Sequence, residues 1–317
     1  MRIVSLLASA TEMIAALGCL DQLVGRSHEC DYPPAVLQLP LVSTVQIDTA
    51  TSSADIDAQI KQLANNNVVV QENALKALSI YAIDLHLLQE LQPDIIVTQT
   101  QCEVCAVSER DVRQALQHTT GLQPRIVSLA PYQLADVWED LARVGKALGR
   151  GEQAEQLIDG YKQRIEHIKN KVTGLRGNKQ VPGVTILEWL DPLMAAGNWT
   201  PELVEYAGGD AVFGAVGEHS PWLSWDELRQ ADPEVLILSP CGFSLERTMQ
   251  DVPLLRKNPA WQELRAVKQG RVYAIDGNYY LNRSGPRLVD SVEILAALLW
   301  GEDIDIAVDR AGWVKID

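Results

Sequence analysis

Four of the five cysteines lie where their thiols can do chemistry. The sequence pattern places them just past the carboxyl ends of three apolar strands, at 27–30, 99–105 and 239–243, and they are Cys30, Cys102, Cys105 and Cys241. Cys102 and Cys105 form a C-x-x-C between a strand and a helix expected to begin near Ser108. A helix N-terminus lowers the pKa of nearby thiols and favours the thiolate. Cys19, within an apolar stretch, is interpreted as a buried small hydrophobe.

Thiolates bind soft and borderline metals, and a C-x-x-C with two distant cysteines supplies the four ligands of a zinc site or an iron–sulfur cluster. The sequence therefore predicts a metal-containing ligand held by Cys30, Cys102, Cys105 and Cys241. His28 is expected as a substitute ligand or as a neighbour that orients one. An iron–sulfur cluster is the first expectation and zinc the second. The same context also suits a dithiol oxidoreductase, so an enzymatic role stays open, although a binding protein is favoured and no catalytic residue is assigned.

Two pairs of similar segments indicate how the chain positions these thiols. In 92–97 and 232–238 a proline precedes an uninterrupted apolar strand, and each strand is followed by a cysteine. In 9–18 and 199–208 a helix is expected to begin at Ser9 or Thr200 as N-cap and to end at Gly18 or Gly208. Continuous apolar strands alternating with helices are typical of parallel sheets covered on both faces. The sequence therefore predicts an α/β fold of two lobes, each with a mostly parallel sheet flanked by helices.

The longest helical pattern joins the two lobes. It runs over 134–172 and is interrupted only near 149–151. Its second part repeats apolar residues every three or four positions, which predicts an amphipathic helix of about 20 residues. We expect an N-terminal lobe at 1–150, a connecting helix at 151–175 and a C-terminal lobe at 176–317.

A ligand cleft is expected between the lobes, because ligands of open parallel sheets bind beyond the carboxyl ends of the strands. Besides the cysteines, the side chains expected to bind the ligand there are His28, Glu29, Gln99, Gln101, Trp189, Trp222, Tyr280 and Arg283.

Charge excludes some partners. The 317 residues carry 27 basic and 42 acidic side chains, a net charge of −15. Nucleic-acid affinity comes largely from Lys and Arg that neutralise phosphates, so no nucleic-acid partner is expected.

No apolar run approaches the roughly 18 residues of a membrane helix, and no membrane insertion is expected. Met1 and Arg2 lead directly into an apolar strand, which predicts a cytoplasmic protein if Met1 is the natural start and a periplasmic one if a leader was removed.

Several motifs resemble the vitamin B12-binding proteins of ABC importers. They are the segments 2–12 (RIVSLLASATE), 28–33 (HECDYP), 93–99 (PDIIVTQ) and 285–287 (GPR). The resemblance covers nearly the whole chain. It implies the helical-backbone class of substrate-binding proteins, with two α/β lobes, one connecting helix and the ligand between the lobes. It also implies the alternative function, a cobalamin, corrinoid or tetrapyrrole-chelate binding component of an ABC importer.

The chain departs from this resemblance in the expected cleft. Glu29, Val45 and Gln99 stand where cobalamin-binding relatives carry aromatic residues, and thiols occur instead. The resemblance also implies one acidic residue on each lobe that docks the transporter, and these positions are His86 and Asp226 here. The missing carboxylate makes an ABC permease a disfavoured partner. We therefore expect first a cytoplasmic protein that kept the scaffold and changed its cargo.

Overall fold

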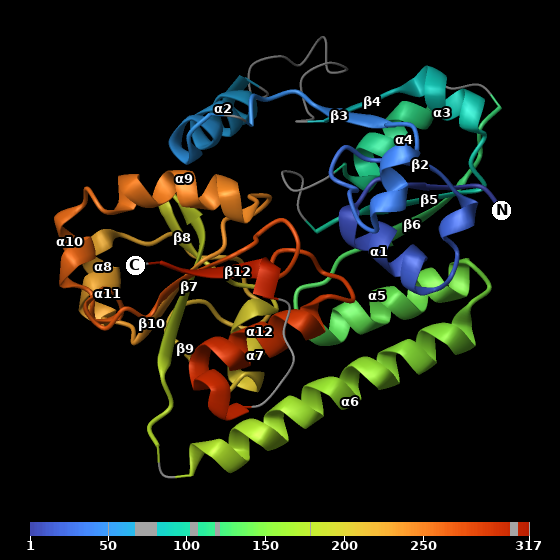
Figure 1. The fold of residues 1–317 in the computed structure, drawn as a ribbon. Helices are drawn as coiled ribbons and strands as arrows, with labels where there is room; N and C mark the ends of the chain where they lie inside the picture. Colours follow the sequence, from blue (N-terminus) through green and yellow to red (C-terminus); the bar gives the residue numbers. More distant parts are fainter. Residues whose placement is uncertain are drawn as a thin grey trace. The chain divides into compact units, whose positions relative to one another are not determined.

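A computed structural model describes residues 1–49, 51–66, 81–101, 107–117, 121–177, 179–304 and 310–316 (Figure 1). The chain divides into two compact units. Unit 1 comprises Met1–Pro131 and Asp136–Ile158, and unit 2 comprises Tyr132–Ala135 and Asp159–Asp317. The division falls inside the longest helix described, α6 (Gly151–Arg176).

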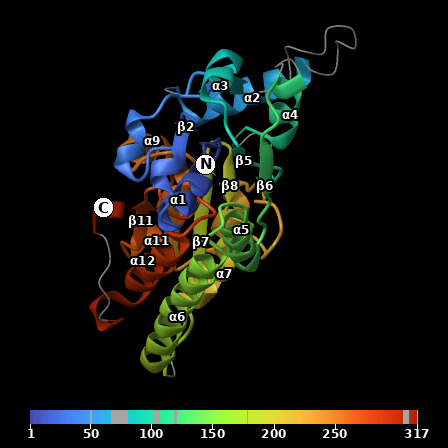
Figure 2. The same cartoon turned by 90° about the vertical axis from the view of Figure 1, so that its right-hand side faces the viewer.

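Unit 1 is built on a four-stranded parallel sheet of order β2-β1-β5-β6. Figure 2 shows β5 and β6 side by side, and their residues pair in register from Ile95 with Arg125 to Gln99 with Leu129. Two further strands, β3 and β4, form a separate antiparallel pair. The strand bounds are β1 (Ile3–Ser5), β2 (Leu23–Arg26), β3 (Ser43–Val45), β4 (Tyr81–Ile83), β5 (Ile95–Gln99) and β6 (Arg125–Leu129).

Helices of unit 1 bury apolar side chains against its sheet. Leu88 and Val112, on α3 and α4, pack with Val4 and Ile96 of the sheet in one buried cluster. Figure 1 shows α5 on the other side of this sheet. The helix bounds are α1 (Ala8–Ala16), α2 (Ser53–Asn66), α3 (Leu85–Leu91), α4 (Glu109–Gln117) and α5 (Leu134–Ala147), with 3-10 turns at Leu20–Gln22 and Pro34–Gln38.

Unit 2 is built on a six-stranded mixed sheet of order β12-β11-β10-β7-β8, with β9 also paired to β7. The strands β7, β10 and β11 run parallel, whereas the outer strands β8 and β12 are antiparallel to their neighbours. The bounds are β7 (Gly183–Leu190), β8 (Leu193–Ala195), β9 (Asp210–Ala211), β10 (Val235–Leu238), β11 (Val272–Ile275) and β12 (Trp313–Ile316).

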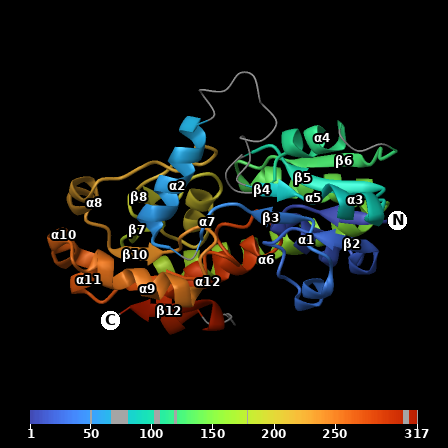
Figure 3. The same ribbon diagram turned by 90° about the horizontal axis from the view of Figure 1, so that it is seen from above.

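The helices α9, α10 and α11 form a row along unit 2 (Figure 3). With α8 they bury Leu228, Val252 and Trp261 against Leu187 and Leu236 of the sheet. Besides α6, the bounds are α7 (Thr200–Tyr206), α8 (Trp225–Ala231), α9 (Leu245–Leu255), α10 (Pro259–Glu263), α11 (Arg265–Lys268) and α12 (Leu288–Trp300), with 3-10 turns at Gly301–Ile304 and Arg310–Gly312. None of the described helices combines the length and apolar character needed to cross a bilayer.

The expected α/β fold with parallel sheets is confirmed, and so are the helix ends before the two prolines. Gln92 and Asp232 adopt left-handed conformations, with φ of 42° and 45°, and close α3 and α8. The helical pattern over 134–172 is confirmed as α5 and α6.

The predicted N-caps were wrong. Ser9 and Thr200 lie inside α1 and α7, whose N-cap residues are Leu7 and Trp199, without a side-chain cap. Both helices begin earlier because the buried turn ahead of each already supplies backbone acceptors, with Leu7 O accepting from Thr11 and Gly197 O accepting from Thr200.

Candidate ligand-binding site

Unit 1 gathers the strand-end residues of the first lobe at one edge of its sheet. The Ser27 N–H donates to Ser5 O at 2.9 Å and the Leu6 N–H donates to Val97 O at 2.9 Å, so the carboxyl ends of β2, β1 and β5 are neighbours. His28, Glu29 and Cys30 follow β2 at this edge, and Gln99, buried, is the last residue of β5. Gln101 is half-buried two residues further on.

His28 is held in place at this edge. Its Nδ1 lies 3.3 Å from Ser43 Oγ, and its ring centroid lies 5.1 Å from that of Tyr81. Its Nε2 lies 3.9 Å from Glu29 Oε1, which is a long and partly exposed pair of little energetic weight. Burial, and secondly the charge of Arg26, lower the pKa of His28. The imidazole is therefore neutral at physiological pH and can accept a proton, a metal or a hydrogen bond.

We expect the free energy of unfolding to fall with decreasing pH partly through His28. A histidine whose pKa is lowered in the folded protein binds its proton more readily when unfolded, so the stability it contributes is complete above about pH 6.5 and is lost as the pH falls below that value. Urea unfolding between pH 8 and pH 5 should show a smaller pH-dependent loss for His28→Gln than for the unsubstituted protein. Equal losses in the two proteins would contradict this assignment.

Cys30 has the surroundings of an interior thiol. Its side chain has no exposed surface. The Thr11 hydroxyl donates to Cys30 Sγ at 2.9 Å, and Ser27 Oγ lies 3.2 Å from the same sulfur. Burial raises the pKa of the Cys30 thiol, and the hydroxyl hydrogen bonds only partly oppose this. A protonated, enclosed sulfur is a poor metal ligand, so these contacts lend no support to Cys30 as one.

Cys241 is the one other predicted cysteine ligand within the part of the chain that the structure describes. Cys102 and Cys105 lie outside the described residues. Cys241 is half-buried just past β10, and its N–H donates to Glu188 O at 3.0 Å. Within the ranges that the structure describes, no group of three or more His, Cys, Asp or Glu side chains is arranged to hold a metal ion.

Unit 2 gathers its own strand ends at one edge. The Ser239 N–H donates to Leu187 O at 2.9 Å, and Asn282 Nδ2 donates to Ser239 O at 2.8 Å, so the ends of β7 and β10 meet the loop after β11. Two aromatic side chains stand at this edge, since the ring centroids of Trp189 and Phe243 lie 5.3 Å apart at 55°.

Arginines stack on the aromatic rings of this edge. Arg247 lies 4.4 Å over the ring of Phe243. Arg283, 7% exposed, donates to Asn278 Oδ1 at 2.9 Å and lies 5.3 Å over Tyr279. Stacking of guanidinium on aromatic faces adds favourable electrostatics to packing. This edge therefore brings aromatic rings together with stacked guanidinium groups, of which Arg247 is also ion-paired with Asp251 at 2.8 Å.

Two further predicted residues differ in exposure. Tyr280 is buried at this edge, whereas Trp222 is 55% exposed and forms an antiparallel backbone bridge with Met194 of β8. Phe243, Arg247 and Tyr279 were not among the residues expected at the site. The signal for two of them is an aromatic residue and an arginine, Phe243 and Arg247, close together directly after a strand end.

A buried carboxylate shapes this edge. Asp276, just past β11, accepts the backbone N–H of Leu245 at 3.2 Å through Oδ2, and the N–H groups of Asn278 at 2.9 Å and Tyr279 at 3.0 Å through Oδ1. Burial raises the pKa of Asp276 while these hydrogen bonds lower it in part. Asp276 thus ties the start of α9, which carries Arg247, to the loop that carries Tyr279.

The two positions implied in transporter docking are both at the surface. His86 is exposed on α3, with Nδ1 3.4 Å from Glu90 Oε1. Asp226 is exposed in the first turn of α8, 3.5 Å from Arg229. A carboxylate therefore stands beside position 86, one helical turn along, although position 86 itself is a histidine.

Comparison with known proteins identifies the family. A model of the periplasmic binding protein family matches residues 3–279. The vitamin B12-binding protein of Vibrio cholerae is 23% identical over 302 residues, covering 94% of this chain and 88% of that protein. An uncharacterised ABC transporter substrate-binding lipoprotein of Bacillus subtilis is 23% identical over 300 residues, covering 94% and 80%.

Solved structures share the fold. A periplasmic heme-binding protein from Pseudomonas aeruginosa has a TM-score of 0.69 at 22% identity, covering 94% of this chain and 92% of that one. The periplasmic vitamin B12-binding protein of Vibrio cholerae has a TM-score of 0.64 at 22% identity, covering 94% and 96%. Since the family model spans most of the sequence and the folds agree, the chain belongs to the periplasmic binding protein family.

Proposed function

We propose that this protein binds a flat metal tetrapyrrole, of the corrinoid or porphyrin kind, as the substrate-binding component of an ABC importer. The observation that carries the proposal is the carboxyl edge of unit 2, where Trp189 and Phe243 lie 5.3 Å apart and Tyr279 stands with stacked arginines. Aromatic faces bury a planar macrocycle well, and a few fixed polar groups orient it.

The relatives support this alternative over the iron–sulfur or zinc cargo that the thiols suggested first. Their names give vitamin B12 or heme as what they bind. The buried, hydrogen-bonded sulfur of Cys30 points the same way.

The names of these relatives also indicate a transporter partner and a cellular location for this protein. They are named as substrate-binding lipoproteins of ABC transporters or as periplasmic proteins. They therefore favour a permease partner, and a site of action outside the cytoplasmic membrane, over the cytoplasmic protein without a permease that we expected first.

Titration of the purified protein with aquocobalamin and with hemin tests the proposal. We expect saturable tryptophan quenching by at least one of them, with a dissociation constant of about 1 μM or lower. Trp189→Ala should weaken that binding about tenfold, because a stacked aromatic contributes roughly 1–2 kcal/mol. The matched control is Tyr206→Ala, an aromatic at the end of α7 that contacts Glu202 and Lys169.

Metal and acid-labile sulfide analysis of the same anaerobic preparation provides the opposing outcome. If the protein binds neither tetrapyrrole and contains iron and sulfide in equal amounts, the proposed function is wrong and an iron–sulfur cluster is the ligand.

A further inference from the structure

Two tryptophans and a methionine of unit 2 stand in one row across three paired segments. Trp189 of β7 pairs with Met194 of β8, and Met194 pairs with Trp222 through an antiparallel backbone bridge. Residues directly opposite each other on paired strands place their side chains on the same face of a sheet. Leu193 and Leu223, next to Met194 and Trp222 in the chain, pack into the apolar core on the opposite face. The row therefore lies on the face turned away from that core, and its two tryptophans stand two strand spacings apart, about 10 Å.

A β-bulge lies beside the row. The register between β7 and β8 shifts between Leu187, which pairs with Ala195, and Trp189, which pairs with Met194. Glu188 is therefore the extra residue of β7 at this point. A bulge bends its strand and redirects the side chains next to it, and bulges are common beside binding sites.

The side chain of Glu188 reaches the segment that carries Trp222. The Ser220 hydroxyl donates to Glu188 Oε2 at 2.9 Å and accepts the Gly197 N–H at 3.1 Å. Burial raises the pKa of Glu188, and the hydrogen bonds from Ser220 and Gly197 lower it in part. Backbone hydrogen bonds of 2.9 Å and 2.8 Å join residues 221–223 to β8, and the contact with Glu188 fixes the start of that segment, two residues before Trp222.

We propose that Glu188 and Ser220 are positioning residues of the ligand-binding edge, which hold Trp222 in one row with Trp189 so that the macrocycle lies on both rings. This inference rests on the proposed function. A flat ligand gains most from two rings that are fixed before it binds, because ordering a loose side chain during binding costs affinity. A buried carboxyl group held by neutral donors costs stability. At this site it gives in return a fixed position to an aromatic side chain that is 55% exposed.

A double-mutant cycle on the binding of hemin and aquocobalamin tests this role. Glu188→Ala should weaken the binding of either probe about tenfold, because Ser220 loses its acceptor and Trp222 its fixed position. Trp222→Ala should weaken binding about tenfold through loss of the ring. The protein with both substitutions should bind no more than about twofold more weakly than Trp222→Ala, because Glu188 acts on the ligand only through that ring.

Three further variants separate positioning from charge and from folding. Glu188→Gln keeps an acceptor oxygen for the Ser220 hydroxyl and should restore most of the affinity. Ser220→Ala removes the donor and should repeat both the loss and its dependence on Trp222, so the test stands even if Glu188→Ala does not fold. The control is Glu205→Ala, at an exposed carboxylate on α7, which should leave the affinity unchanged. Thermal unfolding of each variant without ligand shows whether it is folded.

The outcomes distinguish this inference from the function on which it rests. Additive losses in the protein with both substitutions, or binding by Glu188→Gln as weak as by Glu188→Ala, overturn the positioning role and leave tetrapyrrole binding standing. If the unsubstituted protein binds neither hemin nor aquocobalamin, the proposed function is overturned and this inference with it.

Discussion

Gly208→Ala is expected to lower the free energy of unfolding by about 3 kcal/mol, the sum of left-handed backbone strain and overpacking. Gly208 follows α7 and closes it with φ of +81°. A Cβ at this position would lie 2.1 Å from Val172 Cγ1 on α6 and 2.9 Å from Trp300 Nε1 on α12. Trp300 has no freedom to retreat, because its Nε1 donates to Ala207 O at 3.0 Å. The new methyl group would therefore separate three helices that meet at this point.

A double-mutant cycle isolates the packing part of this effect. Val172→Ala removes the nearest methyl group, so Gly208→Ala should cost less in that background, by about 1 kcal/mol or more. Gly160→Ala is the matched control, because Gly160 lies in α6 without a positive φ and a methyl group added there would meet no atom within 4 Å outside the backbone of its own helical turns. It should raise stability by about 0.5–1 kcal/mol, the usual gain of alanine over glycine in a helix. Urea unfolding followed by circular dichroism measures each of these proteins, and similar effects at Gly208 and Gly160 would refute the argument.

Asp276→Ala is expected to cost about 2–4 kcal/mol of stability and to weaken tetrapyrrole binding at least tenfold, because three backbone N–H groups lose their acceptor. Those donors belong to Leu245, Asn278 and Tyr279. The loop has little room to find a substitute, since a Cβ on the adjacent Gly277 would lie 2.0 Å from Pro240 O. Loss of the carboxylate therefore frees both the loop carrying Tyr279 and the start of α9.

Two further variants keep this prediction testable. Asp276→Asn retains one acceptor oxygen and should recover part of the stability and of the binding, with the same fold by circular dichroism. Asp210→Ala, at an exposed carboxylate in β9, removes the same charge and should leave both quantities within about 0.5 kcal/mol of their original values. If tetrapyrrole binding is unchanged in Asp276→Ala, the ligand-binding edge of unit 2 does not depend on the hydrogen bonds that Asp276 accepts.

Local sequence patterns predicted the elements because the interactions that form them are local. The prolines at 93 and 233 mark where α3 and α8 end, and the apolar runs after them form β5 and β10, buried along their whole length. The repeat of apolar residues in α6 was readable for the same reason. Helix starts were less readable: Ser9 has a capping residue type, yet α1 begins at Ala8 because the turn after β1 decides it.

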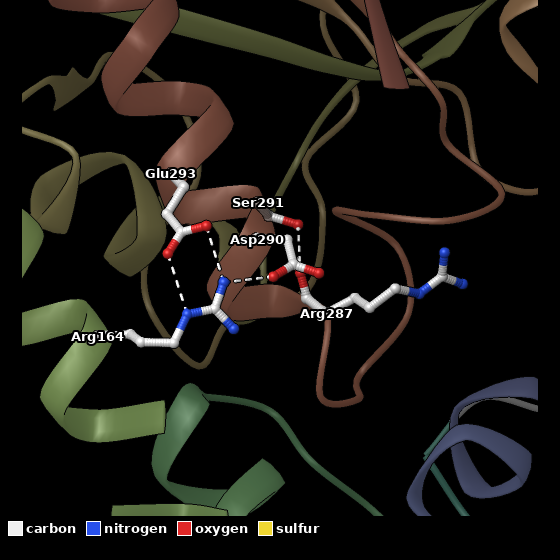
Figure 4. Close-up of polar contacts among 5 residues, drawn as sticks. All are labelled: Arg164, Arg287, Asp290, Ser291 and Glu293. Atoms are coloured by element: carbon white, nitrogen blue, oxygen red, sulfur yellow. Dashed lines mark hydrogen bonds and ion pairs between the residues drawn. The ribbon is translucent and has the colours of Figure 1, made fainter. Parts of the chain in front are cut away.

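The chemical site was harder to predict because a residue's type does not state its surroundings. The place of Cys30 after a strand suggests a metal ligand, and only the folded unit shows Thr11 and Ser27 enclosing its sulfur. From the sequence, Arg287 suits an anion ligand and a partner of the acidic surface equally. Only the folded unit shows that Asp290 and Glu293 pair with Arg164, which lies more than a hundred residues earlier (Figure 4).

Periodicity, turn residues and short motifs were enough to predict the α/β class, several individual helices and strands, and the resemblance to vitamin B12-binding proteins. Tertiary structure alone decided which charged side chains pair, which thiol is sealed from solvent, and which arginines lie over tyrosine rings. The physical reason is that burial, pKa and ion pairing depend on atoms brought close in space from distant parts of the chain. The sequence pattern predicts the strand end where Cys30 lies, but it does not predict the hydroxyl groups around the Cys30 sulfur.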